Sequence, residues 1–287
     1  MSSAAVVVEL DDQQDDQRVL DYAVREALLG CGELVLVTPY REYRTSPSGS
    51  ASAEAAAVLR ETAGRLEQRY GAQLTVSVLP MEGSRAKVMV RAAEGARIVV
   101  VGRSAGGGPS GLRAAQSSLR VATAAHCPVV VVPRRWRSSP ASSGVVVGVD
   151  GTPLSLEAVA YAFEVAAGRG SELRVVHSYW MRYGSPYGAH DWLGSAQLTV
   201  SESLAGWDEK YPNVRVSRLL TTRPILDTLA SESAYAELVV VGAHAGAGAI
   251  GDPITRRAIA ETNCPIAIVA HPATSAAPGQ HVRLAVT

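Results

Sequence analysis

The chain has 287 residues, enough for two domains of ordinary size or one large one. Its 27 Lys and Arg residues balance 27 Asp and Glu residues, so no net charge draws it to nucleic acid or to an anionic membrane. Apolar residues make up 47% of the chain with a single Phe, and a core of small branched side chains suits buried parallel strands covered by helices.

The cysteines and the start of the chain favour a reducing compartment. Cys31, Cys127 and Cys264 are odd in number and widely spaced, which argues against a disulfide framework. No secretory signal opens the sequence, and no apolar run approaches the roughly 18 residues of a membrane span. We therefore expect a cytoplasmic protein that has no membrane partner. Cys and His do not cluster at ligand spacing, so no metal site is expected.

The first half of the chain is predicted to alternate short apolar strands with helices. A β-branched run from Val6 ends in the acid Asp11, and Gly30 ends a helix whose apolar face runs from Leu20 to Leu28. The later segments continue the alternation, with strands at 34–38, 74–79, 98–101 and 129–132 and helices around 87–94 and 117–125. This pattern predicts a parallel sheet with helices on both faces.

The second half repeats the first. Three landmarks recur in the same order: an acid that closes the opening strand (Asp11 and Asp150), a glycine after three valines (Gly102 and Gly242), and a cysteine before a proline (Cys127 and Cys264). Their separations are 139, 140 and 137 residues, so the second copy lacks three residues between its glycine and its cysteine. Such a repeat predicts a duplicated domain.

The predicted fold is α/β, with two tandem open parallel five-stranded sheets of the Rossmann type and helices on both faces. In the second copy, Thr152 can cap a helix with Pro153 at its first position, and a strand follows at 173–177. The predicted division is a first domain at 1–133, a linker at 134–144 rich in Pro, Ser and Arg, a second domain at 145–272 and a tail at 273–287.

The chemistry of this fold is expected beyond the carboxyl ends of the strands, where the strand order reverses. The residues that leave those ends are Asp11 or Asp150, Thr38 or His177, and Gly102 or Gly242. Glycine-rich loops follow at 102–111 and 242–251. Such a loop can present backbone N–H groups to phosphates at a helix N-terminus, although a flexible connection would have the same composition.

The opening Val-Gly-Val-Asp-Gly-Thr at 147–152, the Val-Val-Val-Gly loops and the closing Cys-Pro strands together resemble the universal stress protein family. The resemblance covers nearly the whole chain twice and implies a fold like that of the adenine nucleotide alpha hydrolases. In the ATP-binding branch of that family, the first-strand Asp approaches adenosine, and the glycines and a hydroxyl of the loop hold the phosphates. By resemblance, the candidate nucleotide-binding residues are Asp11, Thr38, Val101, Gly102, Ala105, Ala115, Gln116 and Ser117 in the first copy, and Asp150, Gly151, His177, Val241, Gly242 and Ala245 in the second.

Both loops depart from the family pattern. In the first copy two expected glycines are Ala105 and Ala115 and the expected hydroxyl is Gln116, which weakens the pocket, since an alanine in a left-handed conformation costs roughly 1 kcal/mol. In the second copy Asp252 and Pro253 replace the last Gly and Ser. A carboxylate about 4 Å from a phosphate costs about 1 kcal/mol per charge in water. We therefore expect no triphosphate there, leaving AMP, another small ligand or nothing.

Simpler interpretations accompany several of these residues. Asp11 and Asp150 either face adenosine or only begin a helix. His177 and His244 have no nucleophile or acid at a recognisable catalytic spacing. The aromatic segment 179–192 is either a lid or partner surface, or a loop packed on its own domain.

The resemblance implies a non-catalytic stress-response protein regulated by ATP or AMP. The alternatives are a scaffold or dimerisation protein with decayed sites and, less favoured, an ATP-using enzyme on the same fold. The resemblance also implies that strands 129–132 and 265–269 pair with each other. The expected partners are an adenine nucleotide, a second chain in a homodimer and an unidentified protein, with no nucleic acid.

Overall fold

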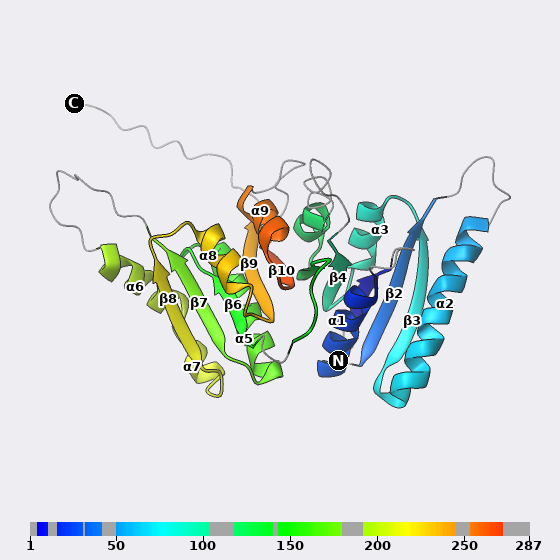
Figure 1. Cartoon of the computed structure of the whole chain (residues 1–287), viewed down its shortest axis with the longest axis horizontal. Coiled ribbons are helices and arrows are strands. Elements are labelled where there is room, and N and C mark those ends of the chain that lie inside the picture. The colour runs from blue at the N-terminus through cyan, green and yellow to red at the C-terminus, as the bar shows by residue number, and fades with distance from the viewer. Residues whose placement is uncertain are drawn as a thin grey trace, which may run out of the picture.

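The computed structural model describes residues 5–10, 16–30, 32–41, 50–103, 118–139, 143–179, 192–244 and 253–271. Its two halves lie side by side, the first on the right of Figure 1 and the second on the left.

The first half has the predicted order of strands, together with one helix and one short 3-10 helix that were not predicted. Its strands are β1 (Val6–Glu9), β2 (Glu33–Tyr40), β3 (Thr75–Glu82), β4 (Ile98–Gly102) and β5 (Val129–Val132). Its helices are α1 (Asp16–Leu29), α2 (Ser50–Tyr70), the short 3-10 helix η1 (Gly71–Gln73), α3 (Arg85–Ala92) and a further helix at 118–124.

The second half follows the same order. Its strands are β6 (Val145–Gly148), β7 (Leu173–Ser178), β8 (Val216–Thr221), β9 (Leu238–His244) and β10 (Ile266–His271). Its helices are α5 (Pro153–Arg169), α6 (Trp192–Ser203), α7 (Trp207–Lys210), α8 (Ile225–Glu232) and α9 (Pro253–Glu261).

The ten strands form one sheet in the order β3-β2-β1-β4-β5-β10-β9-β6-β7-β8. Within each half all pairs are parallel, and the halves meet through the antiparallel pair β5 and β10, where Ile266 lies opposite Val131. The prediction of five parallel strands per half is confirmed. The pairing of the last strands, which the resemblance implied, joins the two expected sheets into one.

The strand order fixes which face each helix covers. Right-handed crossovers place α1 and α2 on one face of the first half and α3 on the other. In the second half they place α5, the equivalent of α1, on one face and α8, the equivalent of α3, on the other. The buried strands are almost entirely Val, Ile and Leu, as expected for strands covered on both faces.

Helix α2 was not predicted. Its buried positions are Ala55, Leu59, Thr62, Ala63 and Leu66, which have helical spacing but are mostly small. Small residues on one face give a weak hydrophobic pattern, so the segment does not stand out from the polar sequence before it. None of the described helices is long and apolar enough to cross a membrane.

Candidate functional site

The strand order reverses at two places, between β1 and β4 in the first half and between β6 and β9 in the second. In an open parallel sheet a ligand binds beyond the carboxyl ends of the strands at such a place. Thr38, Gly102, His177 and Gly242 lie within the last three residues of their strands, and Asp150 lies two residues after β6.

Asp150 is exposed at the end of the second half's first strand. Its Oδ1 accepts hydrogen bonds from the backbone N–H of Thr152 at 2.9 Å and from the Thr152 hydroxyl at 2.6 Å. Partial burial acts to raise the pKa of Asp150, but the bonds from Thr152 and Ser155 outweigh it, and the pKa lies below its usual value of 3.8. The strand end therefore presents a fixed, ionised carboxylate.

The predicted cap of α5 is confirmed in position but not in its bond. Thr152 is the N-cap residue and Pro153 the first residue of the helix, yet the Thr152 side chain makes no capping hydrogen bond, and its hydroxyl donates to Asp150. Thr152 thus orients the Asp150 carboxylate. At the other end of α5, Gly170 has a left-handed conformation, with φ of 61°.

Two glycines shape the same site. Gly151 has φ of +80°, and a Cβ there would lie 2.7 Å from Cγ2 of Thr199 on α6. At Gly242 a Cβ would lie 2.8 Å from the carbonyl carbon of Leu154 and still closer to its oxygen. Both positions need glycine, the first for its conformation and the second because the start of α5 packs directly on β9.

Equivalent side chains hold the strand ends of both halves. The Thr38 hydroxyl donates to the Leu10 carbonyl at 2.9 Å, and His177 Nδ1 contacts the Val149 carbonyl at 2.8 Å. Because a carbonyl oxygen only accepts, Nδ1 of His177 is the donor in this contact. The two halves therefore share one arrangement at these strand ends.

The switch point of the first half holds an ion pair that was not predicted from the sequence. Arg85, at the start of α3, donates from Nε and Nη2 to Glu9 at 2.5 and 2.7 Å, and from Nη2 to the Gly102 carbonyl at 3.0 Å. The Glu9 side chain is 3% exposed. Comparison of the two copies could have pointed to this pair, because a charged residue, Glu9, occupies the position of Gly148 in the second copy.

The other candidates divide into buried and undescribed residues. Val101 and Val241 are buried in β4 and β9, so their side chains pack in the core. The predictions for Asp11, Ala105, Ala115, Gln116, Ser117, Ala245 and Asp252, and for segment 180–191, fall outside the described residues. The structure therefore brings together strand-end residues in each half and leaves the phosphate loops untested.

The cysteines before the closing strands lie in or beside the core. Cys264 is buried and Cys127 half-buried. Burial raises the pKa of Cys127 to about 11 and that of Cys264 to about 12. Both are therefore thiols at neutral pH. In the described part of the chain no group of three His, Cys, Asp or Glu side chains could hold a metal.

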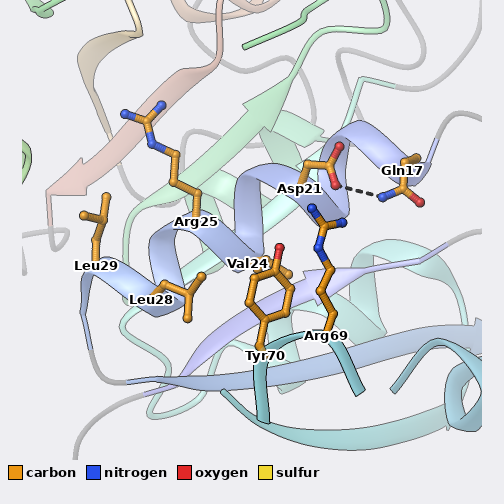
Figure 2. Close-up of a pocket in the computed structure, with 8 residues that line it drawn as sticks. All are labelled: Gln17, Asp21, Val24, Arg25, Leu28, Leu29, Arg69 and Tyr70. Atoms are coloured by element: carbon orange, nitrogen blue, oxygen red, sulfur yellow. Dashed lines mark hydrogen bonds between the residues drawn. The ribbon is translucent and has the colours of Figure 1, made fainter. Parts of the chain in front are cut away.

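A groove of about 530 Å³ lies away from the strand ends, between α1 and the last residues of α2 (Figure 2). Leu28 and Leu29 are partly exposed in it, and Gln17 donates to Asp21 at 2.8 Å. Leu28, Leu29 and Tyr70 come just before β2 or β3 begins, at the amino edge of the sheet. None of the candidate strand-end residues lines this groove.

Comparison with known proteins decides the family. The sequence profile of the universal stress protein family matches residues 4–133 and again residues 143–270. The chain belongs to the universal stress protein family. Universal stress protein Rv2623 of Mycobacterium tuberculosis is 29% identical over 273 residues, which cover 87% of this chain and 90% of that protein.

Further relatives agree with this assignment. Universal stress protein Rv2005c of M. tuberculosis is 38% identical over 169 residues, but the match spans only 57% of each chain. A universal stress protein from Archaeoglobus fulgidus superposes with a TM-score of 0.70 over 93% of this chain and 96% of its own, at 18% identity. That likeness shows the tandem α/β fold.

Proposed function

We propose that this universal stress protein is a non-catalytic stress-response protein of the cytoplasm, regulated by an adenine nucleotide bound beyond β6, β7 and β9. The observation that carries the proposal is Asp150, an exposed and ionised carboxylate fixed by Thr152 at a switch point of the sheet. A parallel sheet offers ligands its best-organised crevice at that point.

The polar groups around Asp150 favour a ligand that donates hydrogen bonds. The Asp150 carboxylate is an acceptor that follows β6, and His177 comes from the neighbouring strand, β7. The amino group of adenine and the hydroxyls of ribose are donors that match the carboxylate.

The sequence beyond β9 favours a mononucleotide over a triphosphate. Pro253 is the first residue of α9, so one N–H that could meet a phosphate is absent. Asp252 directly precedes it and adds a negative charge. We therefore expect AMP to bind more tightly than ATP.

The contacts near Asp150 support a role in binding more than in catalysis. The Thr152 hydroxyl donates to the carboxylate, the Ser155 hydroxyl donates to the Thr152 carbonyl, and His177 is held by the Val149 carbonyl. An activated nucleophile would instead bond to a base.

The proposal also includes a homodimer, which sedimentation velocity would detect.

The test is to denature the purified protein, identify any released nucleotide, and titrate ATP, ADP and AMP calorimetrically. Asp150→Asn should weaken AMP binding about tenfold or more, because a charged hydrogen bond contributes roughly 1.5–3 kcal/mol. Asp208→Asn removes a carboxylate from α7, before the amino end of β8, and should leave binding unchanged. Absence of both released nucleotide and binding heat would contradict the proposal and favour the scaffold alternative.

A further inference from the structure

The two halves differ at one position of their first strands. Glu9 pairs with Val37 in β1 and β2, and Gly148 pairs with Val176 in the same register of β6 and β7. Glu9 and Gly148 are therefore structural equivalents. At Gly148 an added Cβ would make only ordinary contact, 3.5 Å from Leu229 on α8, whereas the first half buries a carboxylate there.

The helix that follows differs in a matching way. Arg85 and Ile225 are the first residues of α3 and α8, which are equivalent helices. Arg85 reaches both Glu9 on β1 and the carbonyl of Gly102 at the end of β4. Its guanidinium thus bridges the two strands between which the sheet order reverses. In the second half an apolar side chain takes its place.

Opening this bridge for a ligand is unfavourable. The Glu9 side chain is 3% exposed and that of Arg85 26%, and two guanidinium nitrogens donate to the carboxylate. A ligand that displaced Arg85 would leave a buried carboxylate without that partner. A nucleotide phosphate near Glu9 would also meet its negative charge.

We propose that the Glu9–Arg85 ion pair closes the ligand crevice of the first half, so that the chain binds one adenine nucleotide, in the second half. This inference rests on the proposed function and adds that the first half has no open site, so that the chain has one. The duplicated domain thereby has one nucleotide-binding half and one half closed by its own side chains.

Calorimetric titration of the full chain with AMP counts the sites, and the repeat supplies matched variants. The wild-type chain should bind one AMP. Gly148→Glu with Ile225→Arg transfers the ion pair to the second half and should weaken binding at least tenfold. Glu9→Gly with Arg85→Ile transfers the second half's residues to the first and should raise the stoichiometry to two.

Two AMP per wild-type chain, or an unchanged single site in Glu9→Gly/Arg85→Ile, would overturn the inference. Failure of the wild type to bind any adenine nucleotide would instead refute the proposed function. Hydrogen exchange of the wild type gives a test that does not depend on the folding of variants. AMP should slow exchange at 149–152 and 241–244, and protection at 9–10 and 101–103 instead would contradict the inference.

Discussion

Two glycines of the second half differ in the room they leave for a side chain. A Cβ added at Gly242 would lie 2.8 Å from the carbonyl carbon of Leu154, whereas a Cβ added at Gly168 on α5 would meet no atom within 4 Å. Backbone cannot move aside as the end of a flexible side chain can. The start of α5 can therefore pack closely on β9 only because Gly242 has no Cβ.

We expect Gly242→Ala to destabilise the protein by roughly 1–3 kcal/mol, as overpacking does. Gly168→Ala should instead stabilise it by about 0.5–1 kcal/mol, because alanine loses less conformational freedom in a helix. Urea unfolding of both variants checks the pair. Equal changes in the free energy of unfolding would contradict the close packing of α5 on β9.

The hydrogen bonds of Thr152 should control the titration of Asp150. Their net effect is to lower the pKa of the folded state, so the ionised carboxylate stabilises the fold above the unfolded pKa, and this stabilisation is lost as pH falls through the folded pKa. Thr152→Val removes the hydroxyl donor and should raise the pKa of Asp150. Thr152→Ser keeps the donor and should change it little. Carboxyl NMR titration measures both, and an unchanged pKa in the valine variant would refute the assigned cause.

At the residue level, the sequence predicted positions better than contacts. Thr38, Asp150, His177 and Gly242 lie at or near the carboxyl ends of their strands, and their role in binding stays a prediction. The Glu9–Arg85 pair was not predicted, because its members are 76 residues apart in the sequence and meet only in the folded chain. Long-range side-chain pairing of this kind leaves no local pattern.

Between elements, α1 and α5 meet across the two halves through charged side chains. Arg169 of α5 is 3% exposed and donates to the Tyr22 hydroxyl at 2.9 Å, to Glu26 of α1, and to Glu237 at 3.4 Å. Arg25 of α1 donates to Glu237 at 2.6 Å but is 36% exposed. The buried arginine therefore has the larger role in this network.

Arg169→Met should lower the free energy of unfolding by about 3–5 kcal/mol, because it leaves buried Glu26 without its main cation. Arg25→Met should cost less than about 1 kcal/mol, since partly exposed pairs contribute little. Urea denaturation compares the two variants. Equal losses would contradict the assignment of the network to Arg169.

Strands and helices with a strong hydrophobic pattern in the sequence could be predicted, and those with a weak one could not. The valine runs of β4, β5 and β6 and the Thr-Pro start of α5 were placed within a residue or two. Helix α2 was missed because three of its five buried residues, Ala55, Thr62 and Ala63, are small. Local sequence identifies an element when its buried residues are large or β-branched.

For the whole molecule, the continuous sheet should make unfolding cooperative. The antiparallel pairing of β5 with β10 links the two cores, and Arg103 of the first half donates to the carbonyls of Ile259 and Ala260 at the end of α9 at 2.8 and 2.9 Å. We expect one thermal transition, with fluorescence and circular dichroism coinciding. Two separated transitions would show that the halves unfold independently.

A duplicated domain that retains one nucleotide site is the central proposal for this molecule. Its most direct test is a crystal structure of the full chain grown with AMP. We predict ligand density beyond β6, β7 and β9, against Asp150 and His177, with Arg85 still bonded to Glu9. Density beyond β1, β2 and β4, with Arg85 displaced from Glu9, would contradict this proposal.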